Sequence, residues 1–124
     1  ILAGQSLGGL AALYIAQNHP HAFRELIVQS PSLWWKPNKT AVPTDNNLQN
    51  SSWITEQFSR QPAMPRLRID VGAREDVGVA KAHLLARKLS DCGWPHQLEV
   101  YEGGHDHVAW RAQLVAHLRE IAIA

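Results

Sequence analysis

The sequence predicts an α/β fold in which a mostly parallel sheet is flanked by helices. Short apolar runs alternate along the chain with longer segments whose apolar residues recur at helical spacing. Glycine, serine or proline follows most of these runs, as expected where strands end. The 124 residues are 45% hydrophobic and 19% charged, which suffices for one domain with a buried core. Alternating strands and helices need crossover connections, and these favour parallel pairing.

The elements are predicted in chain order from these patterns. Residues 1–3 predict the end of a buried strand, and residues 7–18 predict a helix that ends before Pro20. The later strands are predicted at Glu25–Gln29, Arg66–Val71 and Gln97–Tyr101. The later helices are predicted at Trp53–Arg60, Val79–Leu89 and Val108–Ile123. Lys36–Ser52 contains two prolines and four asparagines and predicts a long surface loop.

Composition excludes several classes of protein. A net charge of +1 provides no basic surface for nucleic acid, and no apolar run is long enough for a membrane span. Cys92 is the only cysteine, so no internal disulfide forms, which favours a cytoplasmic location with the periplasm as the alternative. The chain opens with Ile1 inside a predicted strand and lacks an initiator methionine. We therefore expect residues 1–124 to be the C-terminal portion of a single catalytic domain, with its upstream strands missing.

Gly4-Gln5-Ser6-Leu7-Gly8 has the Gly-x-Ser-x-Gly pattern of a nucleophile elbow. A strand that turns into a helix over one residue projects the serine hydroxyl outward, and side chains at Gly4 and Gly8 are expected to collide with neighbouring backbone. The helix that follows points its first amides at the site, so the Leu7 N–H is the predicted oxyanion donor. The alternative is a glycine turn with a solvated serine. The apolar strand before the motif and the apolar helix after it favour the elbow.

A nucleophilic serine needs a base that is held by an acid, in the chain order serine, acid, histidine. Glu75 and Asp76 follow the predicted strand that ends near Gly72, and His105 follows the next one. Both segments lie at carboxyl ends of strands, where open α/β sheets build their sites. The order and the positions predict a serine hydrolase, with either carboxylate as the acid.

The other histidines are expected to have structural roles. His107 competes with His105 but lies next to the first turn of the last helix, where it can cap or pack. His105-Asp106-His107 offers two metal ligands, whereas a catalytic zinc site usually needs three, so we expect neither metal nor cofactor. The remaining histidines are His19, His21, His83, His96 and His117.

The chain resembles the enterochelin (enterobactin) esterase family of α/β-hydrolases. The matching stretches, in order, are "GQSLGGLAALYIAQNHPHAF", "SPSLWW", "VGARED" and "EGGHDHVAWR". The resemblance implies esterases that open catecholate trilactone siderophores and release iron. It implies that Ser6 is the nucleophile, His105 the base and Glu75 the acid, with Asp76 as the competing acid. A second oxyanion donor usually comes from an earlier loop, so this segment alone is expected to be inactive.

Two adjacent tryptophans predict either a substrate-binding loop or a loop with one indole packed beneath it and the other incidental. Trp34 and Trp35 cannot both face the core of a regular strand, and indole faces suit stacking on catechol rings. Lys36, Arg74 and Arg111 are candidate partners for an anionic ester substrate, whereas Trp110 is expected in the core. Rival functions are a related carboxylesterase, acyltransferase or peptide hydrolase, and a non-catalytic hydrolase-like binding module. An intact serine, acid and histidine in the correct order argues against the binding module. The oligomeric state is left open.

Overall fold

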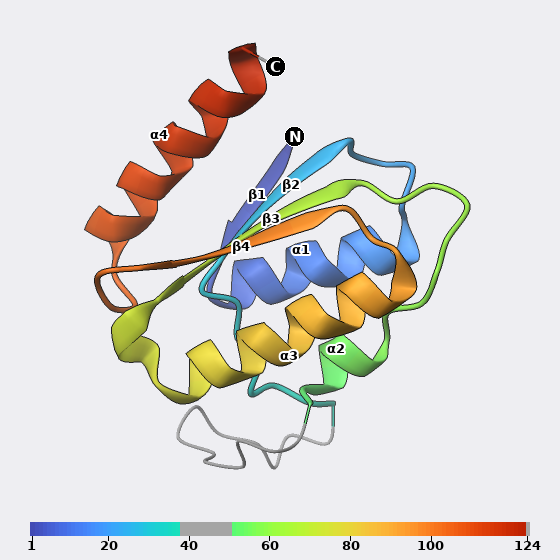
Figure 1. Cartoon of the computed structure of the whole chain (residues 1–124), viewed down its shortest axis with the longest axis horizontal. Coiled ribbons are helices and arrows are strands. Elements are labelled where there is room, and N and C mark those ends of the chain that lie inside the picture. Colours follow the sequence, from blue (N-terminus) through green and yellow to red (C-terminus); the bar gives the residue numbers. More distant parts are fainter. Residues whose placement is uncertain (38–50, 124) are drawn as a thin grey trace.

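A four-stranded parallel sheet forms the centre of the computed structural model, which describes residues 1–37 and 51–123 (Figure 1). The strands are β1 (Leu2–Gln5), β2 (Glu25–Gln29), β3 (Arg66–Gly72) and β4 (His96–Tyr101). They pair in the order β1-β2-β3-β4, and every pair is parallel. The predicted α/β class with a parallel sheet is confirmed, and β1 lies at one end of the strand order.

The helices are α1 (Leu7–Asn18), α2 (Trp53–Glu56), α3 (Val77–Cys92) and α4 (His107–Ile123), with a short 3₁₀ turn at Ala73–Glu75. The predicted helix over Trp53–Arg60 is wrong in its second half, because Phe58 leaves α2 to pack edge-on against Trp94 at 5.0 Å between ring centroids. Most of the predicted loop over Lys36–Ser52 lies outside the described residues. None of the helices described is long and apolar enough to cross a bilayer.

The two faces of the sheet differ in chemistry. Helices α1, α2 and α3 cover one face and bury the main apolar core, whereas α4 lies against the other face (Figure 1). Under α4, adjacent register positions on the four strands carry a polar row, Gln5, Gln29, Asp70 and Glu99. Gln29 donates one hydrogen bond to Asp70 at 3.0 Å and another to the Trp110 carbonyl at 2.9 Å. Hydrogen bonds, more than apolar contact, therefore attach α4 to the sheet.

His117 joins the middle of α4 to this polar row. Its Nε2 atom lies 2.8 Å from Asp70 Oδ1, and both side chains are buried. The hydrogen bond to Asp70 raises the pKa of His117, and burial opposes the rise. Arg68, which is paired with Glu25 and Glu120, also opposes the rise, whereas the charge of Glu120 supports it. The pair therefore holds a proton more tightly in the folded protein than in the unfolded chain.

We expect this pair to make the stability of the protein depend on pH. A histidine pKa that is raised on folding stabilises fully below the unfolded value of about 6.5, and this stabilisation is lost as pH rises through the folded pKa. His117→Gln keeps a donor but does not titrate. The difference in free energy of unfolding between wild type and this variant should be largest below about pH 6.5 and should shrink as pH rises from this value into the alkaline range. Urea unfolding of both proteins measures it, and a difference that stays constant over this range contradicts the assignment.

The sheet also determines where the functional residues meet. The carboxyl ends of parallel strands lie along one edge, where open α/β sheets bind their ligands. Ser6 follows β1, Ser30 follows β2, Glu75 follows β3 and His105 follows β4. Four segments that are distant in sequence therefore arrive at one edge of the sheet.

Candidate active site

Ser6 occupies a strained turn between β1 and α1. Its backbone has φ 58° and ψ −121°, a conformation that side chains rarely adopt. A Cβ at Gly4 would collide with the Gly8 carbonyl, so the predicted need for glycine holds at Gly4. At Gly8 the steric prediction is wrong, because a Cβ there meets no described atom within 4 Å. The close approach of the first turn of α1 to β1 therefore requires glycine on the strand side only.

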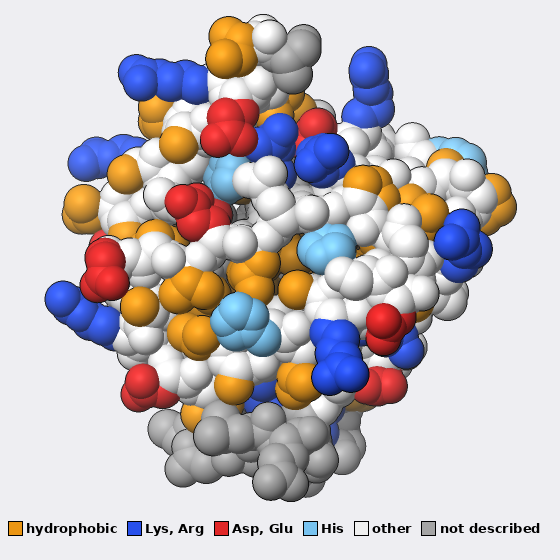
Figure 2. All heavy atoms as spheres, viewed as in Figure 1, with side chains coloured by type: hydrophobic (Ala, Val, Ile, Leu, Met, Phe, Trp, Pro, Cys, Tyr) orange, Lys and Arg blue, Asp and Glu red, His pale blue; other side chains and the backbone are white. Residues whose placement is uncertain are grey.

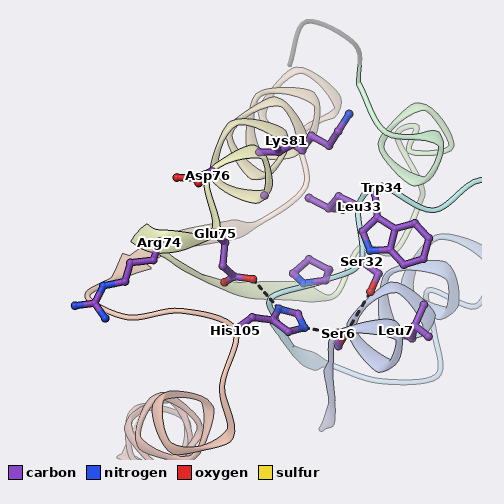
Figure 3. Close-up of a pocket in the computed structure, with 13 residues that line it drawn as sticks. Ser6, Leu7, Ser32, Leu33, Trp34, Arg74, Glu75, Asp76, Lys81 and His105 are labelled. Atoms are coloured by element: carbon purple, nitrogen blue, oxygen red, sulfur yellow. Dashed lines mark hydrogen bonds and ion pairs between the residues drawn. The ribbon is translucent and has the colours of Figure 1, made fainter. Parts of the chain in front are cut away.

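Ser6, His105 and Glu75 form one hydrogen-bonded series (Figure 3). His105 Nε2 lies 3.0 Å from Ser6 Oγ, and His105 Nδ1 lies 2.7 Å from Glu75 Oε1. A carboxylate only accepts hydrogen bonds, so Nδ1 carries the ring proton and Nε2 is left to accept from the serine hydroxyl. This is the arrangement that activates a serine nucleophile.

The second oxygen of Glu75 is held from the opposite side. Oε2 accepts the Ser30 hydroxyl at 2.7 Å and the Gly72 N–H at 2.6 Å. Ser30 Oγ in turn accepts the Trp110 indole N–H at 2.8 Å, so α4 supports the carboxylate through Ser30. Trp110 is buried, as predicted. Sequence reasoning missed the role of Ser30, whose position directly after β2 was the available signal.

Tyr101 fixes the loop that carries His105. Its hydroxyl donates to the Gly104 carbonyl at 2.7 Å, one residue before the histidine. Burial raises the pKa of Tyr101, partly offset by its hydrogen bond with Ser30, so the phenol stays protonated and remains a donor. The imidazole therefore sits on a loop that is tied to the end of β4.

The competing side chains have other contacts. Asp76 is exposed at the start of α3, and in Figure 3 its carboxylate points away from His105. Asp106 Oδ1 accepts the Ala109 N–H at 2.9 Å and so caps α4. The His107 ring packs edge-on against Trp110 at 5.0 Å between centroids. The structure therefore brings Glu75, and neither aspartate, to His105.

We expect Glu75→Gln to lower kcat by up to about 10⁴, because an amide cannot hold the imidazole in the required tautomer. Asp76→Asn is the matched control on the neighbouring residue and should leave kcat near the wild-type value. Steady-state hydrolysis of an aryl ester by both variants measures the difference. A larger loss in Asp76→Asn than in Glu75→Gln would reverse the assignment of the acid.

A cavity of about 600 Å³ opens beside Ser6 (Figure 3). Its lining includes the predicted Leu7, Trp34 and Arg74, and also Ser32 and Lys81, which the sequence did not indicate. Leu7 opens α1, where the first backbone N–H groups have no acceptor within the helix. Arg74 and Lys81 are the basic residues of the lining, and in Figure 3 their charged ends point away from Ser6.

The structure does not bring three of the predicted binding residues to this cavity. Trp35 packs edge-on against Trp53 at 5.4 Å between centroids and joins the apolar core, so only one of the two tryptophans lines the cavity. Lys36 is not among the lining residues. Arg111 is exposed on α4, which lies on the opposite face of the sheet from α1 and α3 (Figure 1).

The group with metal-ligand spacing in the described part of the chain is Asp70, Glu99 and His117. It lies under α4 rather than at the cavity beside Ser6, and hydrogen bonds from Gln29 and Gln113 already engage the carboxylates. Gln113 Nε2 contacts Glu99 at 2.5 Å and Asp70 at 3.4 Å. These hydrogen bonds explain the cluster, because they attach α4 to the sheet.

Comparison with known proteins identifies relatives along most of the chain. The iron(III) salmochelin esterase of Escherichia coli O6:H1 is 36% identical over 116 residues, which cover 93% of this chain and 28% of the relative. The iron(III) enterobactin esterase of Dickeya dadantii is 33% identical over 125 residues, which cover 96% of this chain and 28% of the relative. The chain therefore spans about 28% of the length of the curated relatives it matches.

Solved structures give the same result. The enterobactin esterase of Shigella flexneri, determined in the presence of enterobactin, matches with a TM-score of 0.72 and 28% identity over 91% of this chain and 28% of that chain. The ferric enterobactin esterase of Salmonella typhimurium matches with a TM-score of 0.66 and 28% identity over 93% of this chain and 28% of that chain. Residues 1–121 match the family described as "Putative esterase". The chain belongs to this esterase family and is related to iron(III) siderophore esterases.

Proposed function

We propose that the full-length protein is a serine esterase that hydrolyses the ester bonds of a catecholate trilactone siderophore, of the enterobactin type, to release iron. The observation that carries the proposal is the series from Ser6 through His105 to Glu75, which opens onto a cavity. The relatedness to enterobactin and salmochelin esterases supports the substrate class. We further propose that these residues form the C-terminal portion of a single catalytic domain and have no esterase activity alone.

Ser6, His105, Glu75 and the Leu7 N–H each have a defined role in the proposed reaction. His105 Nε2 takes the Ser6 proton as Ser6 Oγ attacks the ester carbonyl, and the carbonyl oxygen becomes an oxyanion beside the Leu7 N–H. Glu75 stabilises the imidazolium, which then donates its proton to the departing alkoxide. The products of this half-reaction are an alcohol and an acyl-Ser6 ester. Water, deprotonated by His105, hydrolyses the acyl-enzyme and restores the Ser6 hydroxyl.

The chemistry of the cavity favours an anionic aromatic ester. Trp34 offers an indole face for stacking on a catechol ring. Arg74 and Lys81 are basic residues of the cavity lining, and their positive charge favours the negative charge of a ferric catecholate.

Incubation of the full-length protein with purified catecholate trilactones, with and without iron, tests the proposal. Mass spectrometry should show linear trimer, dimer and monomer products that each gain one water per ester opened. The Ser6→Ala variant is the control for spontaneous hydrolysis. If the protein hydrolyses simple aryl esters but leaves the trilactone intact, it is instead a carboxylesterase of other specificity.

A further inference from the structure

A second hydroxyl lies beside the proposed nucleophile. Ser32 Oγ is 3.5 Å from Ser6 Oγ, on the loop that follows β2. Ser32 is only 3% exposed, yet it lines the cavity into which Ser6 opens. Burial of a hydroxyl without a good hydrogen-bond partner is unfavourable, so its presence beside the nucleophile indicates a role in the reaction.

Backbone contacts hold Ser32 firmly against the elbow. The Ser32 N–H donates to the Ser6 carbonyl at 3.1 Å, so the two residues are joined by their main chains as well. The same loop packs on the first turn of α1, where a Cβ at Gly9 would come within 3.0 Å of Pro31 Cα. Further along, the Trp35 N–H donates to the Ser32 carbonyl at 3.2 Å. The position of Ser32 is therefore fixed before any substrate binds.

The hydroxyl of Ser32 is only weakly engaged. A strong O–H···O hydrogen bond spans about 2.7–2.8 Å, and the contact with Ser6 Oγ, at 3.5 Å, is well beyond this length. Among the described residues, Ser6 is the one hydrogen-bond partner of this hydroxyl. Ser32 thus keeps a donor close to the reacting oxygen without committing it to a strong bond.

The side of Ser6 on which Ser32 lies indicates the role of the Ser32 hydroxyl. His105 reaches Ser6 from the side of Glu75, whereas Ser32 and Leu7 lie on the side toward Trp34 (Figure 3). In acyl transfer the leaving group must face the base, and the oxyanion points into a separate group of donors. Ser32 is therefore on the side where the Leu7 N–H is expected to meet the oxyanion.

We propose that the Ser32 hydroxyl is an oxyanion donor for the ester hydrolysis proposed above, acting together with the Leu7 N–H. Ser32 donates a hydrogen bond to the developing negative charge and keeps its own proton, so it forms and breaks no covalent bond. It does not act as a second nucleophile, because the imidazole nitrogen that could deprotonate a serine is directed at Ser6. Its contribution is made when charge develops, which is when a preorganised donor accelerates a reaction.

Kinetics of Ser32→Ala in the full-length protein test this role. With an aryl ester, kcat should fall by about 10²-fold, as when one oxyanion donor is removed elsewhere, and KM should change little. Affinity for an aryl boronic acid, which forms a tetrahedral anion on the serine, should fall by a similar factor. Ser32→Thr retains the hydroxyl and should recover part of the activity. The pH dependence of kcat should stay that of wild type, because His105 and Glu75 are unchanged.

A matched control separates catalysis from packing. Ser52 is another buried serine, which caps α2 through Thr55 and is not among the residues that line the cavity, so Ser52→Ala should lower stability and leave kcat unchanged. Wild-type kcat in Ser32→Ala overturns the inference, and so does a loss of kcat with unchanged boronate affinity. If wild type is active, Ser6→Ala is inactive and Ser32→Ala keeps the wild-type kcat, the inference about Ser32 is overturned and the proposed function stands. Wild type that hydrolyses no ester overturns the proposed function together with the inference.

Discussion

Replacement of Ser6 by alanine in the full-length protein should lower kcat for ester hydrolysis by about 10⁶, the loss measured when a triad nucleophile is removed. The reason is that Ser6 Oγ lies within hydrogen-bond reach of the His105 imidazole, whose other nitrogen is held by Glu75. Within the described part of the chain, the hydrogen bonds of Ser6 Oγ are those with His105 and Ser32, so its loss should leave the fold intact. Steady-state kinetics and a thermal unfolding curve measure the two effects separately.

Ser90→Ala is a suitable control for this change. Ser90 lies near the end of α3, where its hydroxyl contacts His96 at 3.3 Å, outside the cavity. Its replacement should leave kcat unchanged. A Ser6→Ala protein that is folded and retains most of its turnover would show that the elbow does not carry the nucleophile.

Replacement of His105 by alanine should cost about as much as loss of Ser6, because the nucleophile and its base act as one unit. The double variant should therefore be little worse than either single one. His107→Ala is the matched control, since among the described residues its ring packs edge-on against Trp110 and has no hydrogen bond to Ser6 or Glu75. Its effect on kcat should be small. Kinetics of the three variants with an iron-free ester substrate measure this pattern.

Two results would contradict the role of His105. One is a larger loss in His107→Ala than in His105→Ala. The other is strong inhibition of the iron-free reaction by a chelator, which would indicate a metal-dependent site. The substrate must be free of iron in this test, because a chelator removes iron from a ferric siderophore.

The features predicted from sequence are those that depend on chain order. Strand ends in a parallel sheet must share one edge, so Ser6, Glu75 and His105 could be placed together without knowledge of their side-chain contacts. The elbow was predictable because a strand that runs directly into a helix allows few backbone conformations. The helical spacing of apolar residues located α3 within a few residues, and the apolar run after Ser6 together with the His19-Pro20 boundary located α1.

The features that were missed depend on how loops pack. Neighbouring Trp34 and Trp35 have the same chemistry, and only the contact with Trp53 decides that Trp35 turns to the core. Ser30 and Ser32 differ in role because one faces Glu75 and the other faces Ser6. Sequence alone does not fix the direction of a loop side chain, since tertiary contacts select it.

The pairing of Asp70 with His117 was missed for a related reason. Asp70 alternates with apolar residues in the second half of β3, and its partner is 47 residues further along the chain. The alternation of side chains along β3 turns Asp70 toward α4, while Ile69 faces the main core. A buried carboxylate in a strand was the available signal, but it does not say which residue neutralises it.

Covalent labelling with a fluorophosphonate tests the central claim most directly. The reagent reacts with an activated serine, so peptide mass spectrometry of the full-length protein should find one adduct, on Ser6. Labelling should be abolished in Ser6→Ala and strongly slowed in His105→Ala. In the wild-type protein, the adduct should form at the same rate as esterase activity is lost. An active esterase that carries no adduct on Ser6, or that is labelled equally fast without His105, would contradict the account.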